Sequence, residues 1–143
     1  MPRALVSLTL ADAKFMLKAA EAKAESLGIP YNIAVVDAGG ALIAFMRQDG
    51  ALEGSIDLAI GKAKTARMFD KTTAYLAELA QPGAPLFGIE RSNGGQVVIF
   101  GGGLPVAIDG QIAGAVGTSA GSVEQDIAVA EEAVAAITSR ATE

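Results

Sequence analysis

The 143 residues have the length of one domain, and their formal net charge of −5 argues against nucleic acid or an anionic membrane as a main partner, because both attract clustered Lys and Arg. The absence of cysteine and histidine excludes disulfides, thiol catalysis, Cys/His zinc sites, Ser-His-Asp triads and the usual imidazole ligand to haem iron. Since 51% of the residues are hydrophobic and only 5% aromatic, we expect a core of small aliphatic side chains and a surplus of apolar surface that favours oligomerisation.

The first predicted helix begins after Thr9, because Thr9 and Asp12 resemble a capping box and apolar residues then recur at helical spacing as far as Gly28. Its main apolar stripe comprises Leu10, Ala13, Leu17, Ala20, Ala24 and Leu27. A narrower strip centred on Phe15 lies outside that stripe. We interpret it as a subunit contact, which a monomeric mass in solution would contradict; the alternative is a single exposed aromatic side chain.

Two apolar, β-branched runs follow, residues 31–37 and 41–47, and the glycine-containing turn between them predicts a β-hairpin. A helix is expected from Glu53 or Ser55 to Phe69, and a shorter one over residues 72–80. Residues 82–96 contain Pro, Gly and a charged pair and read as a long loop.

The second half of the chain predicts strands over residues 97–100 and 104–108, separated by the triple glycine 101–103. Asp109-Gly110 then closes a hairpin with residues 111–118. The last helix is expected to start near Ser122, which forms a second capping box with Gln125. Because tight turns imply antiparallel pairing, the sequence predicts a single α+β domain over residues 1–143 rather than a Rossmann sheet.

Four motifs in a fixed order cover most of the chain. They are RQDGALEGSIDLAIGKAKTA at 47–66, GGGLPV at 101–106, DGQIAGAVGTSAG at 109–121 and QD-x-x-x-A at 125–130. Together they resemble the GlcG/HbpS haem-degrading domain family, which includes the carboxyl-terminal domain of PduO-type corrinoid adenosyltransferases. The resemblance implies a profilin-like α/β/α domain with a five-stranded antiparallel sheet flanked by helices, assembled into homo-oligomers from dimers up to octamers.

The resemblance also implies haem as a candidate cofactor, since some members bind it. Members that use a histidine are no guide here, and Met46 precedes the Arg-x-Asp-Gly turn at a place where relatives would carry one. Iron could still be faced by Tyr31, by Tyr75, by a methionine such as Met46 or Met68, or by a weak hydroxyl ligand. We expect no other metal site.

The candidate ligand-binding residues are Arg47, Asp49, Lys62, Thr65, Gly101, Gly102, Gly103 and Pro105. Lys62 and Thr65 share a helix face with Leu58 and Phe69, where apolar walls and a cation would suit a small organic acid or a haem propionate. The triple glycine would let a flat ligand approach the main chain, the alternative being a sharp bend between strands. Arg47 and Asp49 can also be a surface ion pair, and Lys62 a solvated lysine.

We therefore expect a small-molecule-binding protein whose ligand is apolar and carries a carboxylate, such as haem or another tetrapyrrole. One alternative is an enzyme or accessory protein acting on a small hydroxy or oxo acid in glycolate or aromatic catabolism, with Lys62, Asp37, Asp49 or Glu90 as acid/base. Another is a structural oligomeric module without a ligand. Because MPRALVSLTLADAK does not resemble a signal peptide and no run of about 18 apolar residues occurs, we expect a cytoplasmic protein without membrane contact.

Overall fold

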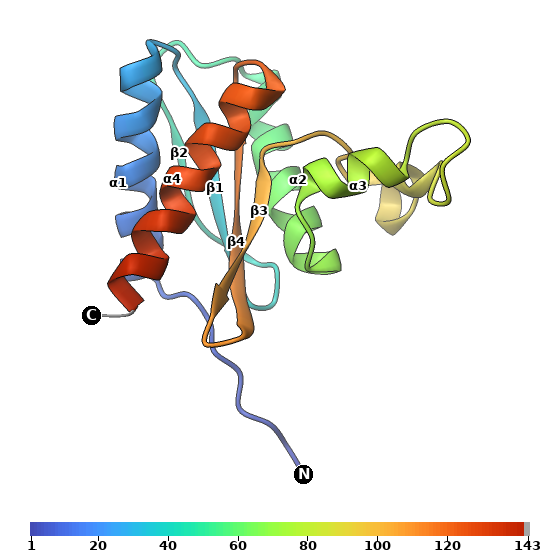
Figure 1. Ribbon diagram of the computed structural model, residues 1–143. Coiled ribbons are helices and arrows are strands. Elements are labelled where there is room, and N and C mark those ends of the chain that lie inside the picture. Colours follow the sequence, from blue (N-terminus) through green and yellow to red (C-terminus); the bar gives the residue numbers. More distant parts are fainter. Residues whose placement is uncertain (142–143) are drawn as a thin grey trace.

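A computed structural model describes residues 1–141 and shows one mixed sheet-and-helix domain (Figure 1). In chain order the elements are α1 (Leu10–Leu27), β1 (Asn32–Asp37), β2 (Leu42–Arg47), α2 (Gly54–Phe69), α3 (Thr73–Leu79), the 3-10 turns η1 (Ile89–Arg91) and η2 (Asn93–Gly95), β3 (Gly103–Ile108), β4 (Gln111–Ser119) and α4 (Val123–Ala141). The sheet is antiparallel, with the order β2-β1-β4-β3. The α+β class predicted from the tight turns is confirmed.

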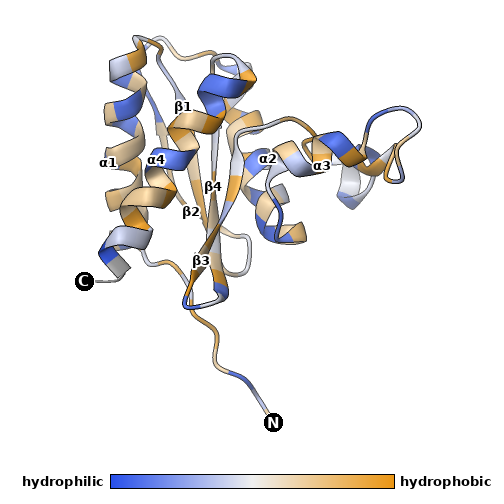
Figure 2. Cartoon of the chain, in the orientation of Figure 1, coloured by the Kyte–Doolittle hydropathy of each residue, from blue (hydrophilic) through white to orange (hydrophobic). Residues whose placement is uncertain are grey.

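Helices cover both faces of the sheet. α1 and α4 lie side by side on one face (Figure 1), and their core includes Met16, Ile33, Val35 and Val116. α2 covers the other face through Ala59, Ala63 and Ala66, which pack on Ala34, Val36 and Ala115. Figure 2 shows hydrophobic residues along the strands, whereas α1 and α4 carry both hydrophobic and hydrophilic stretches. The core is therefore built from small aliphatic side chains in two thin layers.

Local sequence signals set the helix ends. Thr9 accepts a hydrogen bond from the Asp12 amide at 3.2 Å, and Asp12 accepts one from the Thr9 amide at 2.8 Å, so the first capping box forms. Ser122 and Gln125 make the equivalent reciprocal pair before α4, at 2.9 and 3.2 Å. Gly28 ends α1 with a positive φ of 70°, which glycine adopts without strain.

The five-stranded sheet implied by the family resemblance is wrong, because residues 1–141 form a sheet of four strands. The missing element is residues 97–100, an apolar run that lies against α2 instead of joining the sheet. There the Val98 amide donates to the Thr65 hydroxyl at 3.0 Å, and the Val98 side chain covers Gly61. The Thr65 hydroxyl thus accepts the hydrogen bond that the Val98 amide would donate to a neighbouring strand if residues 97–100 joined the sheet.

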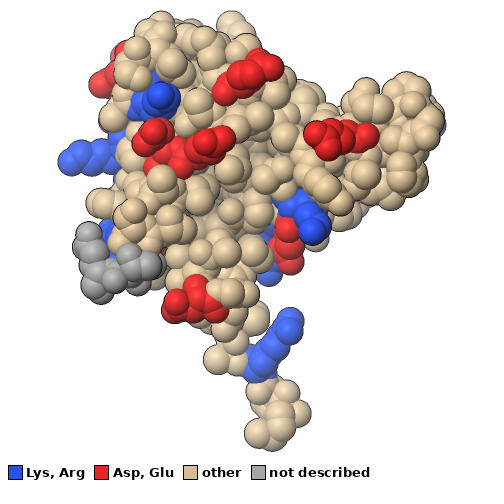
Figure 3. All heavy atoms as spheres, in the orientation of Figure 1, with Lys and Arg blue, Asp and Glu red and all other residues tan. Residues whose placement is uncertain are grey.

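Residues 80–96, including η1 and η2, project away from the sheet beyond α3 (Figure 1). Phe87 is 66% exposed at this projection and Leu86 is 37% exposed. On the face seen in Figure 3, acidic and basic side chains are scattered over a largely uncharged surface. Within residues 1–141, no helix is both long and apolar enough to cross a membrane.

Candidate functional site

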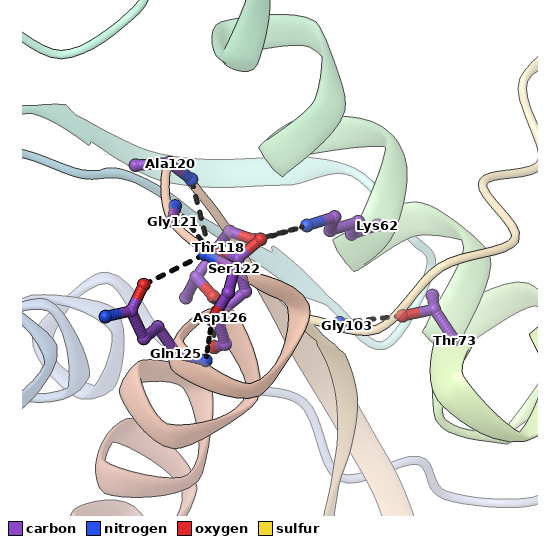
Figure 4. A network of polar contacts seen from close by, with 9 residues as sticks. All are labelled: Lys62, Thr73, Gly103, Thr118, Ala120, Gly121, Ser122, Gln125 and Asp126. Carbon is purple, nitrogen blue, oxygen red and sulfur yellow. Dashed lines mark hydrogen bonds and ion pairs between the residues drawn. The ribbon is translucent and has the colours of Figure 1, made fainter.

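A buried ion pair joins the two helical layers at one end of the sheet. Lys62 on α2 has no exposed surface, and its Nζ lies 2.9 Å from Oδ2 of Asp126 on α4 (Figure 4). The same Nζ donates to the Thr118 carbonyl at 2.9 Å and lies 5.0 Å from the centre of the Phe100 ring. Lys62 is therefore a structural cation with three partners, not a solvated lysine.

The triple glycine makes room for this arrangement, one position at a time. A β-carbon at Gly101 would lie 2.8 Å from side-chain atoms of Val123 and Ile127 on α4. One at Gly102 would lie 2.8 Å from the Lys62 Nζ, and φ there is +125°. One at Gly103 would overlap the Lys62 carbonyl oxygen. Close packing thus accounts for all three glycines, and Gly103 is held further by its amide, which donates to the Thr73 hydroxyl at 2.9 Å.

Asp126, in the first turn of α4, bonds to the chain before the helix as well as to Lys62. Its Oδ1 accepts hydrogen bonds from the amides of Ala120 and Gly121 at 3.2 and 2.9 Å, while Oδ2 faces Lys62. The Thr118 hydroxyl donates to the Asp126 carbonyl at 2.6 Å. Burial lowers the pKa of Lys62, and the hydrogen bond and charge of Asp126 oppose that shift.

Tyr31 completes the buried group. Its side chain is fully buried, and its hydroxyl makes no hydrogen bond of ordinary geometry, although a β-carbon at Gly121 would lie only 2.8 Å away. Burial raises the pKa of the Tyr31 phenol, and the negative charge of Asp126 raises it further. The folded protein therefore favours the neutral phenol.

Replacing Tyr31 by phenylalanine should reduce the fall in the free energy of unfolding that the parent protein shows in alkaline solution. Above the ordinary tyrosine pKa of 10.0, the unfolded chain releases the phenolic proton and the folded chain retains it, so the free energy of unfolding falls as pH rises, by at most about 1.4 kcal/mol per pH unit. Urea unfolding at pH 9, 10 and 11 measures this. Tyr75→Phe, at a 46% exposed side chain, is the matched control and should keep the parent's pH dependence.

The structure separates the predicted ligand residues into two groups. Lys62 lies against the triple glycine, and Thr65, one turn further along α2, holds Val98. Arg47 and Asp49 instead line a hollow of about 320 Å³ with Glu21 and Glu25, on the α1 side of the molecule. Arg47 is half exposed and lies 4.0 Å from Glu53. Pro105 sits within β3, paired with Ala115.

A second hollow lies between α2 and the segment that leads to the triple glycine. Its volume is about 490 Å³, which is within the range of small-molecule sites and above that of the hollow at Arg47. It is lined by Asp57, Leu58, Ile60, Gly61, Lys64, Gly95, Gln96 and Val98. We call it the α2 hollow. Three of its side chains are aliphatic, and its two charged side chains are the carboxylate of Asp57 and the cation of Lys64. Lys64 is the group that can pair with a carboxylate on an apolar ligand.

Sequence reasoning missed Lys64, the cation that lines the α2 hollow, and the pairing of Lys62 with Asp126. Lys64 belongs to the same quoted motif as Lys62, but helical spacing alone does not tell which lysine is buried. Asp126 lies 64 residues from Lys62. One chemical signal was available in the sequence. A lysine on the apolar face of a helix is buried when the helix packs, and a buried lysine requires a carboxylate partner.

The fold is of the α+β class, and its helical layers meet through an ion pair that the triple glycine lines. Residues 8–135 match the family described as haem degrading protein HbpS-like, and the chain belongs to this family. The family resemblance predicted from the four motifs is thereby confirmed.

The relatives include proteins of similar length and domains of longer ones. An uncharacterised 15.0 kDa protein of Citrobacter freundii is 44% identical over 130 residues, which are 91% of this chain and 92% of that protein. The corrinoid adenosyltransferase PduO of Citrobacter freundii is 42% identical over 135 residues, covering 94% of this chain and 40% of that protein. A crystal structure of a PduOC–haem complex superposes with a TM-score of 0.88 and 40% identity, covering 92% of this chain and 95% of that one.

Proposed function

We propose that this protein binds an apolar, carboxylate-bearing small molecule in the α2 hollow, and that haem or another tetrapyrrole is the leading ligand. The observation that carries the proposal is the hollow's composition: Leu58, Ile60 and Val98 form apolar walls, and Lys64 supplies a cation. Membership of the HbpS-like family and the haem complex of the PduOC relative support the choice of ligand.

The residues of the hollow fit two of the three requirements of a haem, namely apolar walls for the macrocycle and a cation for a propionate. The third requirement is an iron ligand, and the hollow does not meet it: the chain has no histidine or cysteine, and no methionine or tyrosine is among the residues that line the hollow. In this proposal Thr65 acts indirectly, since its hydrogen bond to the Val98 amide holds one wall in place.

Lys62 and the triple glycine belong to the framework of the proposed site. An acid/base role for Lys62 on a hydroxy or oxo acid would require its amine to reach a substrate. That amine is fully buried and bonded to Asp126 and Thr118. We therefore favour a structural role over an acid/base role for Lys62.

Reversing the charge of Lys64 should weaken ligand binding by at least about tenfold, because a charge-assisted hydrogen bond to a carboxylate contributes about 1.5–3 kcal/mol. The measurement is a haem titration of the purified protein followed by the Soret band, for the parent and for Lys64→Glu. Lys18→Glu makes the same charge change on the exposed side of α1 and is the matched control. Equal affinities for the two variants, or no saturable binding to the parent at micromolar haem, would contradict the proposal.

Self-association is the second part of the proposed function. Phe87 and Leu86 on the projection beyond α3, and Phe15 on α1, are apolar side chains with substantial exposure, and association would remove them from water. The size of the assembly and the cytoplasmic location remain predictions from the sequence.

A further inference from the structure

The lining of the α2 hollow offers no side chain of the kinds that commonly hold haem iron. The chain has no histidine or cysteine, and its four methionines and two tyrosines lie outside this lining. Met16 and Tyr31 are fully buried, and Met46 lines a different hollow together with three carboxylates and one guanidinium group. Met68 and Tyr75 are partly exposed. A tetrapyrrole in the α2 hollow would therefore be held by its ring face and its carboxylates, not through a metal.

The two charged side chains of the α2 hollow lie at opposite ends of its helical wall. Asp57, in the first turn of α2, and Lys64 are seven residues apart, which is close to two helical turns, so they lie on one side of the helix and about 10 Å apart along its axis. Ile60 and Gly61 lie between them. The helical wall thus presents an anion at one end, a cation at the other and an uncharged surface between the two.

The opposite wall of the hollow carries no charge. It consists of Gly95, Gln96 and Val98, and the Val98 side chain covers Gly61. Among the residues that line the hollow, Asp57 and Lys64 therefore determine which charged groups of a ligand are accepted at each end.

This arrangement distinguishes porphyrins by the position of their carboxylates. Protoporphyrin IX has both propionates on one edge, so it can place that edge at Lys64 and its apolar edge toward Asp57, whose exposed carboxylate stays hydrated. Coproporphyrin III has carboxylates on opposite edges. It must bring one of them toward Asp57, where like charges repel.

We propose that the α2 hollow selects a tetrapyrrole whose carboxylates lie on one edge, with Lys64 pairing with that edge, Asp57 disfavouring a second charged edge, and no side chain of the protein ligating a metal. This inference rests on the binding proposed above and narrows its ligand class. Asp57 is then a specificity-determining residue, and the metal of a haem contributes nothing to its affinity.

The contribution of the metal is measured by comparing haem with metal-free protoporphyrin IX, which has the same periphery. We expect the two dissociation constants, from the Soret band and from porphyrin fluorescence, to agree within about threefold. The haem complexes of Met46→Leu, Met68→Leu and Tyr75→Phe should keep the parent's spectrum. Haem bound more than about tenfold tighter than protoporphyrin, or a changed spectrum in any of these variants, would show that a side chain ligates iron and would overturn the inference.

The role of Asp57 is measured by titrating the parent and Asp57→Asn with protoporphyrin IX and coproporphyrin III. We expect the parent to prefer protoporphyrin, and Asp57→Asn to improve the binding of coproporphyrin relative to protoporphyrin by about two- to fivefold, the effect of one exposed charge pair. The improvement should shrink as salt is added. Glu131→Gln makes the same charge change at an exposed position of α4, across the sheet from α2, and should keep the parent's preference.

The outcomes separate this selectivity from the proposed function. If neither haem nor protoporphyrin binds the parent saturably at micromolar concentration, both are overturned. If both ligands bind and Lys64→Glu weakens them, but Asp57→Asn leaves the preference between the two porphyrins unchanged, only the selectivity is overturned. A preference that changes equally in Asp57→Asn and Glu131→Gln would reflect net charge alone and would likewise overturn it.

Discussion

Replacing Asp126 by asparagine is expected to lower the free energy of unfolding by about 3–5 kcal/mol at pH 7, because it leaves the buried charge of Lys62 without a counter-ion. Asparagine keeps a side-chain oxygen that can still accept from the amides of Ala120 and Gly121, as Oδ1 does in the parent. The substitution therefore removes the charge of Asp126 and retains its hydrogen bonds with these two amides. Urea unfolding of the two proteins measures the difference.

The loss should shrink at high pH. Asp126 raises the pKa of Lys62 against the lowering effect of burial, so removing its charge lowers that pKa further. Between this lowered pKa and the ordinary lysine value of 10.5, the unfolded chain binds more protons than the folded one. The stability of Asp126→Asn accordingly rises with pH over that window.

A second substitution separates charge from packing. Lys62→Met removes the uncompensated cation while filling a similar volume, so the double variant Lys62→Met/Asp126→Asn should be more stable at pH 7 than Asp126→Asn alone. If Asp126→Asn unfolds within about 1 kcal/mol of the parent at pH 7, below the cost of breaking a buried pair, the ion pair does not hold the two layers together.

Elements whose ends are marked by neighbouring residues were predictable from the sequence. Thr9 with Asp12, and Ser122 with Gln125, place their side chains within three residues of the amides they cap, so local chemistry alone fixes where α1 and α4 begin. Asp109-Gly110 likewise fixes the register of the β3–β4 hairpin, with Asp109 and Gly110 both at positive φ.

Residues 97–100 show where local pattern fails. Their apolar, β-branched composition suits a strand, yet the Val98 amide is bonded to Thr65, 33 residues earlier. The choice between a strand neighbour and a helix hydroxyl depends on where α2 lies over the sheet. No pattern within the segment encodes that position.

The candidate site was only partly predictable, because local pattern does not encode which distant residues come together. Lys62 and the triple glycine were expected together and do lie together, but the contact is a packing arrangement with Asp126. Arg47 was expected beside Lys62, whereas it lies at the end of β2, the edge strand opposite β3. Strand order is set by long-range pairing. The number of residues between Arg47 and Lys62 therefore did not predict their distance in the folded protein.

The glycine pair beneath α2 leads to the second large effect, which we expect from Gly117→Ala. Gly117 on β4 pairs with Gly103 on β3, and α2 crosses directly over both. A β-carbon at Gly117 would overlap the Ala59 carbonyl oxygen and lie 2.5 Å from the Ala63 amide nitrogen. These obstacles are helix backbone, so they cannot move aside as a flexible side chain would.

Accommodating the methyl group therefore requires α2 to lift from the sheet, which loosens Ala59, Ala63 and Ala66 together and shifts Lys62 relative to Asp126. We expect Gly117→Ala to lose about 3 kcal/mol or more of stability, at or above the upper end of ordinary overpacking, and the melting temperature to fall by on the order of 10 °C. Gly54→Ala is the control, because a β-carbon in that first turn of α2 meets no atom within 4 Å, and alanine favours the helix by up to about 1 kcal/mol. A melting temperature for Gly117→Ala equal to that of the parent would mean that α2 lies farther from β4 than the glycine pair requires. The close contact that positions Lys62 beside Asp126 would then be contradicted as well.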